Sequence, residues 1–151
     1  MRRKTILVVE DGTEYVETFR RLAMPEAQVD FLPACDVQAA RRILSERRVD
    51  GVFLDVVFDR IPAGNLCGNL EPLITRFAGD DARAFDYLAR NQGFFLAHAL
   101  APLIPPGVPV LLAYDFSSEP ARLAALKTRL PRLEGVEDGV PISKVLERLL
   151  R

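Results

Sequence analysis

Two apolar runs that each end in acidic residues most strongly constrain the fold of this chain. Residues 5–9 read Thr-Ile-Leu-Val-Val and lead into Glu10 and Asp11, and the apolar residues 52–54 lead into Asp55. Short apolar runs rich in β-branched residues are typical of buried strands. In an open parallel α/β sheet, ligands bind at the carboxyl ends of the strands. If the two runs form neighbouring strands, three carboxylates therefore meet at one edge of the sheet.

Such a cluster of carboxylates has a definite chemistry. Like charges raise the pKa of neighbouring carboxyl groups unless a cation is present. Carboxylate oxygens suit Mg²⁺, which takes one or two carboxylates and keeps several waters. The sequence therefore predicts that Glu10, Asp11 and Asp55 form an acidic pocket that binds Mg²⁺ weakly. The alternative is that the three acids are simply polar residues that end strands.

Strand-like and helix-like segments alternate along the chain. The apolar patterns predict strands near residues 5–9, 29–32, 51–55, 109–114 and 133–136. Helical spacing predicts helices near residues 15–23, 37–44, 82–105, 120–130 and 143–150. Asp36 is the expected N-cap of the second helix, and Met24-Pro25 is expected to end the first. This alternation predicts an α/β fold, a doubly wound five-stranded parallel sheet in the order 2-1-3-4-5 with helices on both faces.

The middle of the chain is irregular. Residues 56–81 contain several Gly and Pro residues and show no clean period. A structureless loop of that length is unusual in a compact domain, so the segment is either a functional lid or contains short helices. Because it leaves directly from Asp55, we expect it to cover or border the acidic pocket.

Composition excludes several classes of protein. The chain has 151 residues, 49% of them hydrophobic, which predicts one compact domain over residues 1–151. Its net charge of −1 gives no indication of nucleic-acid binding, and its apolar stretches are too short to span a membrane. Cys35 and Cys67 are expected to be unpaired thiols in a cytoplasmic protein. His98 is the only histidine and has no partners at zinc spacing.

Several segments, taken in order, resemble the receiver domain of two-component response regulators. They read ILVVED at 6–11, FLPACD at 31–36, AARRIL at 39–44, GVFLD at 51–55, PVLLAY at 109–114 and VPISKVL at 140–146. The resemblance covers nearly the whole chain except residues 56–81. It implies a flavodoxin-like receiver fold with an insertion after the third strand.

The resemblance also implies roles for individual residues. Asp55 would accept a phosphoryl group from a histidine kinase, and Glu10 and Asp11 would hold Mg²⁺ with it. The sequence departs from the family at two switch positions, since Tyr114 replaces a small Thr or Ser and Val140 replaces a Lys. Those replacements remove charge-assisted hydrogen bonds worth roughly 1.5–3 kcal/mol each. We therefore expect an atypical or pseudo-receiver that docks to protein partners, with phosphorylation at Asp55 impaired or absent.

Two alternatives remain open. The first is a working phosphoacceptor receiver, phosphorylated on Asp55 in a phosphorelay. The second is a haloacid-dehalogenase-like phosphatase, because Glu10-Asp11-Gly12-Thr13 resembles the nucleophile loop of that family. Val9 stands where that nucleophile would be and has no carboxylate, so we expect no enzymatic activity. We expect a stand-alone domain, monomeric or weakly dimeric, that binds a histidine kinase or a downstream signalling protein through its own surface.

Overall fold

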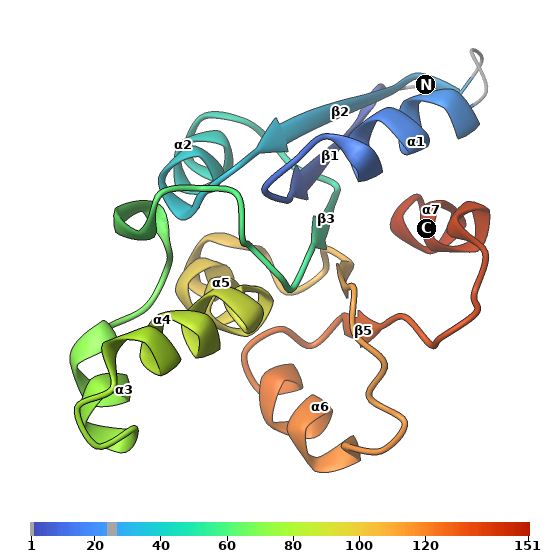
Figure 1. Cartoon of the computed structure of the whole chain (residues 1–151). Helices are drawn as coiled ribbons and strands as arrows, with labels where there is room; N and C mark the ends of the chain where they lie inside the picture. The colour runs from blue at the N-terminus through green and yellow to red at the C-terminus, as the bar shows by residue number, and fades with distance from the viewer. Residues whose placement is uncertain (1, 24–26) are drawn as a thin grey trace.

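The computed structural model of the protein describes residues 2–23 and 27–151, and one parallel sheet organises them (Figure 1). The five strands in these ranges are β1 (Lys4–Val9), β2 (Val29–Ala34), β3 (Gly51–Leu54), β4 (Val110–Leu112) and β5 (Leu133–Gly135). They are arranged in the order β2-β1-β3-β4-β5, and every neighbouring pair is parallel. The predicted sheet and its strand order are confirmed.

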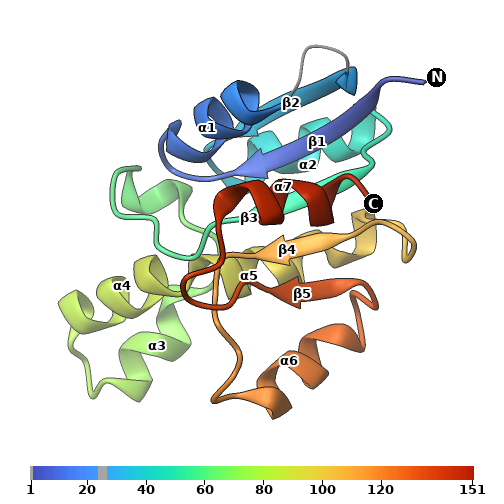
Figure 2. The same ribbon diagram turned by 90° about the vertical axis from the view of Figure 1, so that its right-hand side faces the viewer.

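Helices cover both faces of the sheet (Figure 2). One face carries α1 (Glu14–Leu22) and α7 (Ile142–Leu149), and the other carries α2 (Val37–Glu46), α5 (Gln92–Leu100) and α6 (Pro120–Lys127). Alternate strand residues face opposite sides, so Val8 packs toward α1 and α7 while Val9 packs toward α2 and α5. These two apolar layers hold the helices against both faces of the sheet and leave the carboxyl ends of the strands at its edge.

The central strands bring the acidic strand ends together. β1 pairs with β3 so that Val9 lies beside Leu54, and the Asp55 amide donates to the Val9 carbonyl at 2.9 Å. At the other end of β3, a Cβ on Gly51 would lie 2.9 Å from the backbone oxygen of Leu149. The absence of a side chain at Gly51 therefore lets α7 lie close over β3.

The segment after β3 contains short helices, as expected. A 3₁₀ turn, η2 (Ala63–Asn65), is followed by α3 (Leu70–Arg76) and then by α4 (Asp81–Arg90). α3 and α4 pack mainly on each other, around a small apolar cluster of Leu73, Ala84 and Leu88. They form a helical hairpin at one side of the molecule (Figures 1 and 2).

The prediction of one continuous helix over residues 82–105 is wrong. The helical segment breaks at Asn91 into α4, α5 and a 3₁₀ turn, η3 (Ala101–Leu103). The break follows from tertiary contacts that helical periodicity does not report. Gly93 lies so close to β3 that a Cβ there would be 2.7 Å from the Asp55 carbonyl oxygen. Gln92 is buried, and its side-chain amide bonds the backbone of Cys67.

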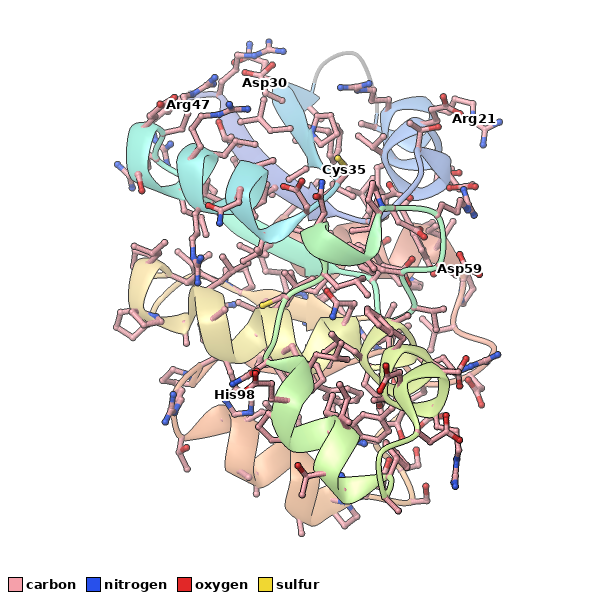
Figure 3. The ribbon with its side chains drawn as sticks, turned by 60° about the vertical axis from the view of Figure 1, so that its left-hand side comes forward. Arg21, Asp30, Cys35, Arg47, Asp59 and His98 are labelled. Carbon is pink, nitrogen blue, oxygen red and sulfur yellow. The ribbon has the colours of Figure 1, made fainter. Side chains whose placement is uncertain are left out.

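The remaining expectations about local structure are largely confirmed. The Asp36 side chain accepts from the Ala39 amide at 2.8 Å and caps α2. Cys35 and Cys67 are both free, and His98 is exposed on α5 (Figure 3). The predicted stop at Met24-Pro25 lies outside the described residues. Within the described ranges, no helix is long and apolar enough to cross a membrane.

Candidate functional site

Glu10 follows β1 at the carboxyl edge of the sheet and holds the start of α1. Its two carboxylate oxygens accept from the amides of Tyr15, at 3.1 Å, and Val16, at 2.9 Å. Only 2% of Glu10 is exposed. Burial raises the pKa of this carboxyl group, although the two amide hydrogen bonds oppose the shift. Glu10 therefore contributes negative charge to the edge while its oxygens cap the helix.

Asp55 follows β3 and is partly buried. One of its oxygens accepts from the Val56 amide at 2.9 Å. The other oxygen makes no hydrogen bond within the described residues. Every fully buried side-chain nitrogen or oxygen in those residues has a hydrogen-bond partner, so this second oxygen of Asp55 is not fully buried and reaches solvent. Burial raises the pKa of Asp55 to about 6, and the charges of Asp11 and Glu10 add to the shift. Asp55 thus presents one open oxygen in a negative environment.

Asp11 ties the segment after β3 to the acidic edge. One of its oxygens accepts from the amides of Asp59, at 2.8 Å, and Arg60, at 3.0 Å. Further along, the Asn65 side chain donates to Asp36 at 3.1 Å. Residues 59 and 60 of the predicted 56–81 segment therefore lie beside Asp11 at the carboxyl edge (Asp59 in Figure 3), whereas residues 70–76 form α3 and pack on α4.

Three residues that the sequence interpretation missed complete the edge. The Arg60 guanidinium pairs with the Glu14 carboxylate. The Tyr15 ring packs on Phe53 with centroids 4.5 Å apart. Burial, with the negative charge of Asp55, raises the pKa of Tyr15. Glu14 and Tyr15 lie within five residues of Glu10, and this closeness in sequence is a signal that they belong to the site. No sequence signal points to Arg60.

The donor set at this edge is suitable for a hard cation. Asp11 and Asp55 each have one oxygen without a hydrogen-bond partner among the described residues. Mg²⁺ is bound by one or two carboxylates and several waters, so these two groups fit it. No group of three His, Cys, Asp or Glu side chains in residues 2–23 and 27–151 is arranged to hold a metal. Both oxygens of Glu10 already accept from the Tyr15 and Val16 amides.

Tyr114 follows β4 with its side chain directed to α5 and α6. Its hydroxyl bonds the Glu119 carboxylate, and its ring packs edge-on against Phe94 and Phe116 at 5.0 Å each. The Arg122 guanidinium lies 3.6 Å from the centroid of the Phe94 ring. Tyr114 is therefore held in an aromatic and ionic cluster.

Val140 lies in the loop between β5 and α7, and it is partly buried against the apolar layer beneath α1 and α7. This loop is held by Asp115, whose carboxylate accepts from the Asp138 amide at 2.8 Å. None of the three lysines of the chain directly follows β5. Lys4 bonds the Leu150 carbonyl at the opposite edge, Lys144 pairs with Glu147, and Lys127 ends α6.

No model of a known protein family matches the chain, and no curated protein matches it either. Solved structures do match. The Francisella response regulator 1452 receiver domain is 14% identical with a TM-score of 0.58, covering 97% of this chain and 93% of that one. A two-component response regulator from Clostridium difficile is 9% identical with a TM-score of 0.59 and the same coverage. The chain has the receiver fold.

A further structure with the receiver fold is described with a modified site. It is a response regulator protein from Burkholderia pseudomallei with a phosphorylated aspartic acid, a calcium ion and citrate. It is 14% identical to this chain with a TM-score of 0.57, covering 97% of this chain and 66% of that one. These likenesses establish the fold, and the roles of individual residues depend on the geometry described above.

Proposed function

We propose that this protein is an atypical receiver in two-component signalling that acts by docking to protein partners, with phosphorylation at Asp55 impaired or absent. The observation that carries this proposal is the fixed position of Tyr114. A switch that reports a phosphoryl group needs a contact that differs between its two states. The Tyr114 hydroxyl is bonded to Glu119, and its ring is packed between Phe94 and Phe116. No small hydroxyl group stands at this position to follow a phosphoryl oxygen.

A second observation supports a largely fixed conformation. Asp115 bonds the Ser117 amide at 2.8 Å and the Asp138 amide at 2.8 Å, which joins the loops after β4 and β5. These are the loops in which the family has its switch residues. Because the donors are backbone amides and the acceptor is Asp115, this tie does not involve the side chain of Tyr114 or Val140.

The acidic edge keeps part of the receiver chemistry. Asp11 and Asp55 would hold Mg²⁺ through their open oxygens. A bound Mg²⁺ would neutralise the carboxylates and the charge of an incoming phosphate. The chain itself supplies a partly buried Asp55 with one oxygen in solvent. Glu10 holds the start of α1 through its bonds to the Tyr15 and Val16 amides.

The open oxygen of Asp55 is also what favours the alternative of a working phosphoacceptor. A carboxylate nucleophile needs in-line access to the phosphoryl group, and this oxygen has solvent access. The phosphatase alternative has no such support, because Val9 is fully buried within β1. In either receiver role the partners are a histidine kinase or a downstream signalling protein, the protein is cytoplasmic, and it is a monomer or weak dimer.

Amide NMR spectra with Mg²⁺ and then beryllofluoride test this proposal. We expect Mg²⁺ to shift the amides near Asp11 and Asp55, and beryllofluoride to add little beyond them. The variant Asp55→Asn is the control for both additions. Large beryllofluoride-dependent shifts in α6 and β5, absent in Asp55→Asn, would contradict the fixed conformation and favour the phosphoacceptor.

A further inference from the structure

A cavity lies at the amino edge of the sheet, opposite the acidic pocket. Its volume is about 490 Å³. It is formed where β1 and β3 begin, where α2 ends, and where the chain enters β4. Both termini lie at this end of the sheet (Figure 2). Arg47, which lines the cavity, and Asp59, which lies beside the acidic pocket, are on opposite sides of the molecule (Figure 3). The cavity is therefore separate from the receiver site.

Positive charge dominates the lining. Six cationic side chains line the cavity, namely Arg2, Lys4, Arg47, Arg48, Arg132 and Arg151. Asp50 is the one acidic side chain among the described lining residues. Like charges gathered in a concave site raise the local potential and concentrate counter-ions.

Asp50 does not neutralise this set. Its oxygens bond the Arg2 guanidinium at 2.7 and 3.2 Å and the Thr5 amide at 2.8 Å, while Arg48 approaches it at 3.8 Å. Accordingly, Arg2 lowers the pKa of Asp50. Among the described residues, the Arg47 side chain makes no hydrogen bond. Arg47 and Arg48 follow α2 and are both exposed, so Arg47 is available to a ligand while Arg48, within the same described part of the chain, approaches only Asp50, at 3.8 Å.

The rest of the lining is apolar. It comprises Leu44, Val49, Leu103, Pro105, Val108 and Pro109, together with Gly107. Ligand pockets of roughly 300–1,000 Å³ with apolar walls and a few convergent charged groups hold small molecules. Guanidinium groups bind phosphate oxygens in a planar, two-point geometry.

We propose that this cavity binds a small anion that carries a chain of phosphates. Several guanidinium groups around one hollow match several phosphate groups in one ligand. Free polyphosphate and a nucleoside polyphosphate share this chemistry, and the apolar wall favours the nucleotide because it can cover the nucleoside. Extended nucleic acid fits less well, since the cations line a hollow and the chain as a whole has a net charge of −1.

Titration calorimetry with ATP and with inorganic tripolyphosphate tests the proposal. We expect saturable binding of both, with ATP the tighter, and about tenfold or greater weakening in a variant with Arg47→Ala and Arg48→Ala. The matched control combines Arg41→Ala and Arg42→Ala, which removes the same charge from exposed positions of α2 outside the cavity. This control should bind within about twofold of wild type.

Several outcomes would overturn the proposal. One is no saturable binding of either phosphate compound by the wild-type protein. Another is equal weakening in the two double variants, which would indicate a diffuse charge effect. A third is binding of double-stranded DNA, with neither phosphate compound bound. Circular dichroism of both variants checks that lost binding is not lost folding.

Discussion

Replacing the buried glutamine Gln92 by leucine is expected to lower the free energy of unfolding by about 3 kcal/mol. Gln92 is 1% exposed. Its side-chain oxygen accepts from the Cys67 amide at 2.8 Å, and its nitrogen donates to the Cys67 carbonyl at 2.7 Å and the Leu88 carbonyl at 3.0 Å. Leucine has a similar size but leaves the Cys67 backbone groups buried without partners, at about 1–3 kcal/mol each.

Urea denaturation of Gln92→Leu measures this loss, and hydrogen exchange at the Cys67 amide locates it. Gln38→Leu is the control, because Gln38 is exposed on α2 and should change stability by less than about 0.5 kcal/mol. If Gln92→Leu were as stable as wild type, the segment after β3 would not be anchored through Cys67. The ties of Asp11 to the Asp59 and Arg60 amides would then be the ones that hold this segment.

Replacing Asp55 by asparagine is expected to stabilise the protein above neutral pH. The pKa of Asp55 is about 6 in the folded protein, above its ordinary value of 3.8. The folded state therefore holds the proton more tightly, and wild-type stability falls as pH rises from about 4 to about 6. The difference between these two pKa values corresponds to about 3 kcal/mol. Partial exposure reduces the expected gain to about 1–2 kcal/mol.

Thermal and urea unfolding of both proteins at about pH 4 and about pH 8 test this expectation. The two should be nearly equal in stability at the lower pH, with the variant more stable at the higher pH. Mg²⁺ should reduce the difference, because it stabilises the charged carboxylates of the wild type. Equal stability at both pH values would mean that the acidic edge is not electrostatically strained.

The fold could be predicted because its signals are local. Residues 6–9 and 52–54 are short apolar runs that include β-branched residues, and they form buried neighbouring strands. The break at Asn91 could not be predicted, because residues 82–103 keep an apolar helical period across it. The break depends on the contact of Gly93 with the Asp55 carbonyl, which joins positions far apart in the sequence.

The candidate site could be predicted only in part. Glu10, Asp11 and Asp55 follow from their positions after strands, because parallel strands end at one edge. Their individual hydrogen bonds could not be predicted from these positions. Glu10 caps α1, and Asp11 accepts from the amides of Asp59 and Arg60. Arg60 lies in an irregular segment whose path no periodicity describes. Its ion pair with Glu14 is visible only in three dimensions.

The most direct measurement is the extent of labelling of Asp55 by acetyl phosphate with Mg²⁺, determined by intact-protein mass spectrometry. Asp55→Asn is the control for labelling at other sites. An atypical receiver with Tyr114 fixed against Glu119 predicts little or no Asp55-dependent increase in mass. Stoichiometric labelling that is lost in Asp55→Asn would contradict this account and identify the protein as a working phosphoacceptor.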